Sequence, residues 1–217
     1  MKTVKDYYLN RFNAKEIKRK NFIWKILCRY CFNNYIKPTD TVMDLGAGYC
    51  EFINNIKCNK KIAVDINPET KKYANKDVSV VNYGPSLLGK YFNQKIDVVF
   101  FSNFLEHLNS KEEVILFIET AYKVLKSGGK LIIMQPNIQL AKEKYWDFID
   151  HKIPLTVPSV VEACELNKFE IEKTIEKFLP FTTKNGYPIY SWMIYLYLKL
   201  PSIFKINAGQ SLVIAKK

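Results

Sequence analysis

The sequence has 217 residues, of which 48% are hydrophobic and 14% aromatic, so we expect one folded domain with a substantial core rather than a disordered chain. Its formal net charge of +12 comes from lysines spread along the chain, and the clusters at 15–20 and 57–61 do not alternate with aromatic residues as a base-stacking groove would. This pattern disfavours nucleic acid as a partner and is compatible with an anionic membrane surface or a phosphate-bearing substrate.

The cysteines and the N-terminal segment indicate the compartment. Five cysteines are an odd number, and Cys28-x-x-Cys31 has no second pair at zinc-site spacing, so we expect no metal site there. The first residues, MKTVKDYYLNRF, contain no apolar stretch of a signal peptide. Reduced thiols then predict a cytoplasmic protein.

The first elements lead to a glycine turn. Residues 1–37 are predicted to be largely helical, and Thr41 to Leu45 form a short buried strand. Gly46 and Gly48 follow this strand, and a helix begins at Glu51. Glycines between a strand and a helix N-terminus let a ligand approach the main chain, so this turn predicts a nucleotide-type site.

A dinucleotide is the first candidate ligand for such a turn. The pattern G-x-G-x-x-G requires its third glycine at position 51, where this chain has Glu51. A carboxylate at that position would repel a pyrophosphate. The sequence therefore disfavours NAD and FAD.

A second acid, Asp65, follows the second predicted strand. The apolar run 61–64 ends at Asp65, which lies 65 − 44 = 21 residues after Asp44. A carboxylate at the end of the second strand can accept hydrogen bonds from both ribose hydroxyls, although Asp65 could instead cap the helix that follows Asn67-Pro68. With the glycine turn upstream, we favour the ribose interpretation.

The remaining pattern alternates strands and helices. Strands are predicted at 77–82, 96–101, 130–135, 169–173 and 211–215, and helices at 110–125 and 158–166. Ser110 is expected to cap its helix in a capping box with Glu113. This order predicts a single α/β domain over 1–217, a doubly wound, seven-stranded, mostly parallel sheet whose last strand is antiparallel.

Several of these motifs resemble one enzyme family. Asp44-Leu45-Gly46-Ala47-Gly48 resembles the hhDhGxGxG turn of class I S-adenosylmethionine (SAM)-dependent methyltransferases, with Cys50 in place of the third glycine. The loop Glu106-His107-Leu108 and the turn Lys126-Ser127-Gly128-Gly129 resemble the same family, in particular its type 11/12 bacterial members. The resemblance implies a Rossmann-like fold, SAM as cofactor and S-adenosylhomocysteine (SAH) as product.

The resemblance also implies site residues. We expect the cofactor to be bound by residues at the ends of the first four strands: Asp44, Gly46, Ala47, Gly48, Asp65, Ile66, Asn82, Ser102 and Asn103. In this family an N-terminal segment often covers the cofactor, so 1–37 is expected to be a helical cap with Tyr7, Tyr8 or Phe12 in the site. Residues 137–160 and 178–208 are expected to be insertions on the acceptor side.

Catalysis of methyl transfer needs alignment, and a hydroxyl acceptor also profits from a general base. The two histidines of the chain are therefore candidates. His107 follows the fourth strand, where it could instead be structural, and His151 lies in a loop where Asp147 or Asp150 could orient it. We predict His151 as the base and His107 as a second catalytic residue, with no metal ion.

The apolar run 189–201 is too short to span a bilayer and has three interpretations, a core helix, a homodimer face or a membrane-surface element. The stretches 146–156 and 178–184 resemble methyltransferases of glycan and cell-surface assembly. We therefore predict O-methylation of a small-molecule or carrier-linked acceptor, such as a sugar or lipid-linked molecule.

Other functions remain open. Methylation of RNA or protein is one alternative, although Gln135-Pro136-Asn137 is a poor substitute for the Asn-Pro-Pro-aromatic motif that grips planar amino groups. A SAM-binding scaffold protein without turnover is another, and a dehydrogenase is the last.

Overall fold

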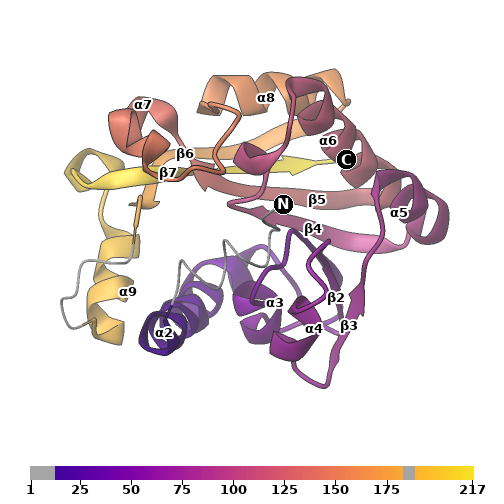
Figure 1. Ribbon diagram of the computed structural model, residues 1–217, viewed down its shortest axis with the longest axis horizontal. Coiled ribbons are helices and arrows are strands. Elements are labelled where there is room, and N and C mark those ends of the chain that lie inside the picture. The colour runs from indigo at the N-terminus through magenta and orange to yellow at the C-terminus, as the bar shows by residue number, and fades with distance from the viewer. Residues whose placement is uncertain (1–12, 183–188) are drawn as a thin grey trace.

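The computed structural model describes residues 13–182 and 189–217, and Tyr7, Tyr8 and Phe12 lie outside this range. Figure 1 shows a central sheet with helices on both faces. The strands are β1 Thr41–Leu45, β2 Lys60–Val64, β3 Val78–Val81, β4 Ile96–Ser102, β5 Leu125–Pro136, β6 Glu170–Pro180 and β7 Ala208–Lys216. The α-helices are α2 Ala14–Tyr30, α3 Glu51–Asn55, α4 Thr70–Tyr73, α5 Pro85–Phe92, α6 Lys111–Val124, α7 Ile138–Ala141, α8 Val157–Leu166 and α9 Ser191–Lys199.

The strand order is β3-β2-β1-β4-β5-β7-β6. The first five strands pair in parallel, β7 is antiparallel to β5, and β6 is antiparallel to β7. The predicted doubly wound sheet with an antiparallel last strand is thus confirmed. The direction of strand addition reverses between β1 and β4, and in such sheets ligands bind at the carboxyl ends of the strands beside this point.

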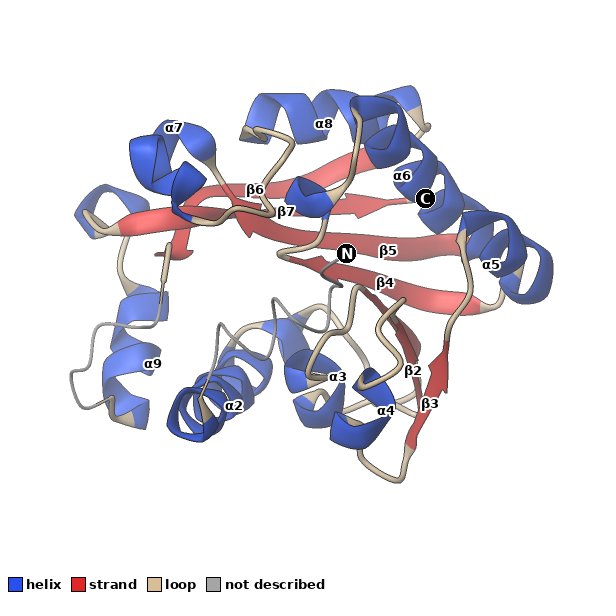
Figure 2. Cartoon of the chain, in the orientation of Figure 1, coloured by secondary structure: helices blue, strands red, loops and turns tan. Residues whose placement is uncertain are grey.

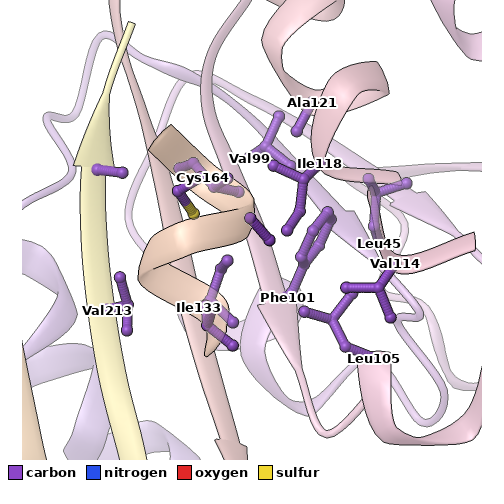
Figure 3. Close-up of a cluster of buried hydrophobic side chains, with 14 of the residues drawn as sticks. Leu45, Val99, Phe101, Leu105, Val114, Ile118, Ala121, Ile133, Cys164 and Val213 are labelled. Carbon is purple, nitrogen blue, oxygen red and sulfur yellow. The ribbon is translucent and has the colours of Figure 1, made fainter. Parts of the chain in front are cut away.

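Both faces of the sheet are buried, as Figure 2 shows for helices above and below the strands. Successive side chains of β4 point to opposite faces of the sheet. Val98 and Phe100 belong to the core cluster that includes α2 and α3, whereas Val99 and Phe101 belong to the cluster that includes α6 and α8. Figure 3 shows Phe101 of this second layer beside Leu105 and Ile118. A strand buried on both faces reads as a continuous apolar run, which is why 96–101 was identifiable.

An aromatic cluster joins the N-terminal helix to the sheet. Trp24 of α2 contacts Phe32, Phe52 and Phe100 with ring centroids 6.0 Å apart, and Phe52 stacks on Phe100 at 3.7 Å. Packing of this kind contributes beyond the area that it buries. It fixes α2 and α3, and with them the glycine turn.

The helix that begins after Ser110 differs from the prediction in one detail. The Ser110 hydroxyl accepts from the Glu113 backbone N–H, as expected. The Glu113 carboxylate, however, accepts from the backbone N–H of Asn109 at 2.9 Å instead of that of Ser110. The cap is therefore one residue longer than a capping box.

The apolar run 189–201 forms α9, which packs beside α2 (Figure 1) through a Tyr30–Tyr195 contact of 5.0 Å. No residue of α9 is fully buried, although Ile194, Tyr197 and Leu198 pack against the core. The 3₁₀ turn η4 (Ser202–Phe204) follows it. Among the described residues, no helix combines the length and apolarity needed to cross a bilayer.

Candidate active site

The glycine turn lies at the carboxyl end of β1. Gly46 has φ +76°, and a Cβ there would lie 2.4 Å from the ring of Phe104, so only glycine fits. Cys50 also adopts a left-handed conformation, φ 60°, and is completely buried. Cysteine thus occupies the glycine position of the pattern at the cost of a backbone conformation that side chains disfavour.

The N–H groups of this turn are used within the protein. Gly46 and Ala47 both donate to the Val64 carbonyl, at 2.9 and 3.1 Å, and Gly48 donates to the Asp65 carboxylate at 2.7 Å. A turn that binds pyrophosphate directs such N–H groups at the phosphates. The geometry therefore argues against a dinucleotide.

Three carboxylates surround the turn. Asp44 is 3% exposed, and burial together with the charges of Glu51 and Asp65 raises its pKa well above the ordinary value. Burial also raises the pKa of Asp65, although hydrogen bonds from the N–H groups of Asn67 and Gly48 oppose the shift. Lys20 of α2 forms a 2.9 Å ion pair with Glu51. Such a concentration of acids favours a cationic ligand.

The ends of the next strands supply the other predicted residues. The Asn82 amide donates to the Ile66 carbonyl at 3.1 Å, which joins the ends of β2 and β3 beside the 70% exposed Ile66 side chain. After β4, Asn103 has φ 48° and donates to the Ser102 hydroxyl at 3.3 Å. The structure thus places all nine predicted cofactor residues at one edge of the sheet.

Both histidines lie together beyond this edge. The ring centroids of His107 and His151 are 5.0 Å apart. Side-chain atoms of Glu106, His107 and His151 all lie within 4.8 Å of one another, and Glu106 is fully buried. We call these three residues the Glu-His-His cluster.

Two backbone hydrogen bonds hold the cluster together. The N–H groups of Lys152 and Ile153 both donate to the Glu106 carbonyl, at 2.8 and 3.1 Å, so the loop after η3 (Lys142–Asp147) is tied to the turn η2 (Leu105–His107). Tyr145 adds a hydrogen bond from its buried hydroxyl to the Ile153 carbonyl. Two segments whose histidines are 151 − 107 = 44 residues apart thereby form one site.

The cluster opens into a cavity of about 400 Å³. Most of its walls are apolar or aromatic, and they come from α2, the end of β5, the 148–151 loop, the end of β6 and α9; examples are Trp24, Met134, Phe148, Leu179 and Met193. A cavity of this size and character suits a small organic molecule or part of a larger one.

Some lining residues were missed by the sequence analysis. Glu106 was quoted only as part of a motif, and Trp24 only as part of a helical segment, yet both line the cavity with Phe148 and Gln210. An isolated aromatic residue in a helix reads as core, so the sequence carries no local signal that separates a cavity wall from a packed interior.

Comparisons with known proteins place this geometry in a family. A family model described as a methyltransferase domain matches residues 43–133, which run from β1 through β5 and include the glycine turn. The fold is similar to that of a SAM-dependent methyltransferase from Archaeoglobus fulgidus, with 22% identity, 97% of this chain and 99% of that chain covered, and a TM-score of 0.70. Residues 43–133 thus form a methyltransferase domain, and the chain shares its fold with SAM-dependent methyltransferases.

Other solved structures share the methyltransferase fold. A chain from the complex between the Trm112 methyltransferase activator and a methyltransferase of Haloferax volcanii is 14% identical, with 100% of this chain and 98% of that chain covered and a TM-score of 0.68. A SAM-dependent methyltransferase from Mesorhizobium loti is 15% identical, with 85% and 95% covered and a TM-score of 0.60. A search of curated proteins gives no match.

The residues of this methyltransferase fit its cofactor. SAM carries an ammonium and a sulfonium cation and no phosphate, so the acids beside the glycine turn, Asp44 and Glu51, complement it where they would repel a pyrophosphate. Burial raises the pKa of Asp44 and of Asp65, so a cation bound beside these two carboxylates would stabilise their charged forms.

Proposed function

We propose that this methyltransferase methylates a hydroxyl oxygen of a small-molecule or carrier-linked acceptor that binds in the cavity. The proposal rests on one observation: two imidazoles and a carboxylate lie together in the wall of an otherwise mainly apolar cavity. Amine acceptors need only be neutral, whereas a hydroxyl requires a group that takes its proton. The Glu-His-His cluster is such a group.

The proposal assigns the cofactor to the edge formed by β1 to β4. Asp44 and the turn Gly46-Ala47-Gly48 would hold the cationic end, and Asp65 would accept from the ribose hydroxyls. Ile66 and Asn82 would contact the adenine, with Ser102 and Asn103 between cofactor and acceptor. Asp65 already accepts from Gly48 and Asn67, but a carboxylate has about four acceptor positions and can take two more bonds.

His151 is the proposed base, with His107 beside it. The Nδ1 atom of His107 lies 3.1 Å from the Asp150 carbonyl oxygen, which orients this ring. In the reaction, the hydroxyl oxygen bonds to the methyl carbon, the electron pair of the C–S bond stays on sulfur, and the hydroxyl proton passes to His151. SAM supplies the activated methyl group, so alignment and proton removal remain for the protein.

The cavity walls favour an acceptor with an apolar or ring-shaped body. Phe148 stacks on His151 with ring centroids 5.1 Å apart, and Phe181 packs against Phe148 at 5.7 Å. Aromatic rings of this kind pack well on apolar and ring-shaped groups. A sugar or a lipid-linked molecule fits these walls.

A membrane-bound carrier would be reached through α9 and η4. Trp192, Ile203, Phe204 and Ile206 are between 61% and 87% exposed there. Arg29 and Lys199 lie over the rings of Tyr30 and Tyr195 at the same end of the molecule. Exposed apolar residues beside cations suit an anionic membrane surface, and the five free cysteines support a reducing, cytoplasmic setting.

This surface can be tested with vesicles. We expect the chain to sediment with vesicles of anionic lipid and not with neutral ones, and the double change Ile203→Ser, Ile206→Ser to abolish sedimentation. If the chain instead forms a dimer that this variant dissociates, the surface is a homodimer face and the membrane proposal is wrong.

The acceptor proposal is tested by methylation of a panel that contains hydroxyl, amine, RNA and protein acceptors, including nucleotide sugars and glycolipids. We expect transfer to a hydroxyl, a loss of at least about 10²-fold in turnover for His151→Ala, and unchanged SAH affinity in that variant. Methylation of RNA or protein alone would favour that alternative. SAH binding without transfer to any acceptor would favour the scaffold interpretation.

A further inference from the structure

We propose that the Glu-His-His cluster binds one divalent ion of a first-row transition metal, such as Mn²⁺, Fe²⁺, Co²⁺ or Zn²⁺. The ligands are a carboxylate oxygen of Glu106 and one ring nitrogen each of His107 and His151. The binding site stands on the geometry alone, and the role of the ion in activating a hydroxyl rests on the proposed function.

The three side chains are spaced for a common ligand. Their ligand atoms lie within 4.8 Å of one another, and the Nε2 atom of His107 is 3.8 Å from a Glu106 oxygen. Metal bonds of about 2.0–2.2 Å to nitrogen and oxygen place ligand atoms about 3–4 Å apart. The rings therefore need shifts of about 1 Å, within the range of small side-chain rotations.

His107 is oriented as metal-binding histidines are. Its Nδ1 atom lies 3.1 Å from the Asp150 carbonyl oxygen and 3.4 Å from the Asp150 carboxylate. An imidazole whose Nδ1–H donates to such a partner presents the lone pair of its Nε2 atom on the other side, and this arrangement recurs around protein metal sites. In His107 that lone pair faces Glu106.

His151 is fixed by its surroundings. It is 9% exposed, stacks on Phe148, and contacts the edge of Tyr145 with ring centroids 4.9 Å apart. The bonds from Lys152 and Ile153 to the Glu106 carbonyl hold its loop against the other two ligands. A site preorganised in this way loses little entropy when an ion binds.

The ligand set selects the kind of ion. Imidazole suits Zn²⁺, Fe²⁺ and similar ions, whereas Mg²⁺ and Ca²⁺ prefer oxygen ligands throughout. Three protein ligands leave coordination positions for other molecules, and here those positions face the cavity. When an ion is bound, an acceptor hydroxyl at one of these positions would have a lowered pKa and release its proton to water, with His151 as a ligand; in the ion-free protein His151 takes that proton as the proposed base.

Titration of the full-length, tag-free and chelator-treated chain with Co²⁺ tests the site. A hexahistidine tag must be absent because it binds the same ions. We expect one Co²⁺ per chain by calorimetry, together with the visible absorption of cobalt bound to nitrogen and oxygen ligands. His151→Ala and Glu106→Gln should each weaken binding by at least about 10-fold.

Glu143→Gln is the matched control, because this exposed acid of η3 lies outside the cluster. Each variant is also tested for SAH binding and for its thermal midpoint, so that a folding defect is recognised, and His151→Gln serves if His151→Ala unfolds. Absence of stoichiometric Co²⁺ binding in the folded wild-type chain, or equal binding in a folded cluster variant, would overturn the proposal.

The two proposals fail in different ways. If the chelator-treated protein methylates hydroxyls at full rate and does not bind added Co²⁺, the metal-site proposal is overturned and His151 remains the base. Stoichiometric Co²⁺ binding by a chain that methylates only amines would contradict the proposed function while supporting the metal site.

Discussion

At the scale of single residues, the acids around the glycine turn combine the binding role that we propose for them with a cost in stability. Asp44 accepts a hydrogen bond from the Ile53 backbone N–H, yet burial and two neighbouring acids raise its pKa. Charged groups taken out of water without a cationic partner destabilise the folded state. The turn is therefore stabilised best when a cation is bound.

Replacement of Asp44 by Asn should stabilise the free protein at neutral pH. A carboxyl with a raised pKa in the folded state lowers stability progressively as the pH rises from its ordinary value of 3.8 to the raised value, because the unfolded state ionises first. Asn cannot ionise and keeps an acceptor for Ile53. We expect a higher thermal midpoint than wild type at about pH 7.5, a smaller difference at about pH 4.5, and weaker SAM binding.

A lower midpoint of Asp44→Asn at neutral pH would contradict this account of the acids. Ser110→Ala is the matched control, because it should lower stability by about 1 kcal/mol through loss of a helix cap, with little dependence on pH and no effect on SAM binding.

Replacement of Asp65 by Ala should weaken SAH binding by about 10-fold or more, because hydrogen bonds to a charged group contribute about 1.5–3 kcal/mol each. Its effect on folding should be smaller, since removal of the carboxylate also removes the cost of burying it. Calorimetric titration and thermal unfolding of the same sample measure both. Unchanged SAH affinity would rule out the ribose assignment.

At the scale of elements, the decisive unit is the segment from η3 to α8, which carries His151 to the end of β4. Its position depends on the bonds to the Glu106 carbonyl and on the Tyr145 hydroxyl, which donates to the Ile153 carbonyl. Burial raises the pKa of Tyr145, so this hydroxyl keeps its proton. The loop is an anchored part of the site.

Replacement of Tyr145 by Phe should therefore loosen the loop. The Ile153 carbonyl loses its partner, which costs about 1–3 kcal/mol in the free energy of unfolding. Turnover should fall while SAH affinity stays unchanged, because the glycine turn is elsewhere. Trp146→Phe is the control, since Trp146 is 52% exposed and its replacement should change stability by less than about 0.5 kcal/mol. Equal behaviour of the two variants would contradict the anchoring role.

At the scale of the whole molecule, the sheet and the glycine turn could be predicted from the sequence because their signals are local. The apolar runs of β1 and β4 and the spacing of Gly46 and Gly48 each lie within a few residues. The Glu-His-His cluster could not be assembled in this way, because Glu106 and His151 meet only through the 148–153 loop. Similarly, the sequence left the run 189–201 open between a core helix, a homodimer face and a membrane-surface element, and only the fold shows that the outer side of α9 is exposed.

The separation in sequence of the residues that line the cavity explains why the acceptor could not be predicted from local motifs. The residues predicted to bind SAM follow strand ends in chain order, whereas the walls of the cavity come from α2, β5, β6 and α9. These elements come from both ends of the chain. Their apolar character is common to many cores, so it does not by itself encode a substrate.

The central claim is that the acidic glycine turn binds SAM and not a dinucleotide. Calorimetric titration of the purified chain with SAH, and separately with NAD, tests it most directly. The account predicts micromolar binding of SAH with one site per chain and no measurable heat with NAD. Binding of NAD, or the absence of SAH binding by the folded chain, would contradict it.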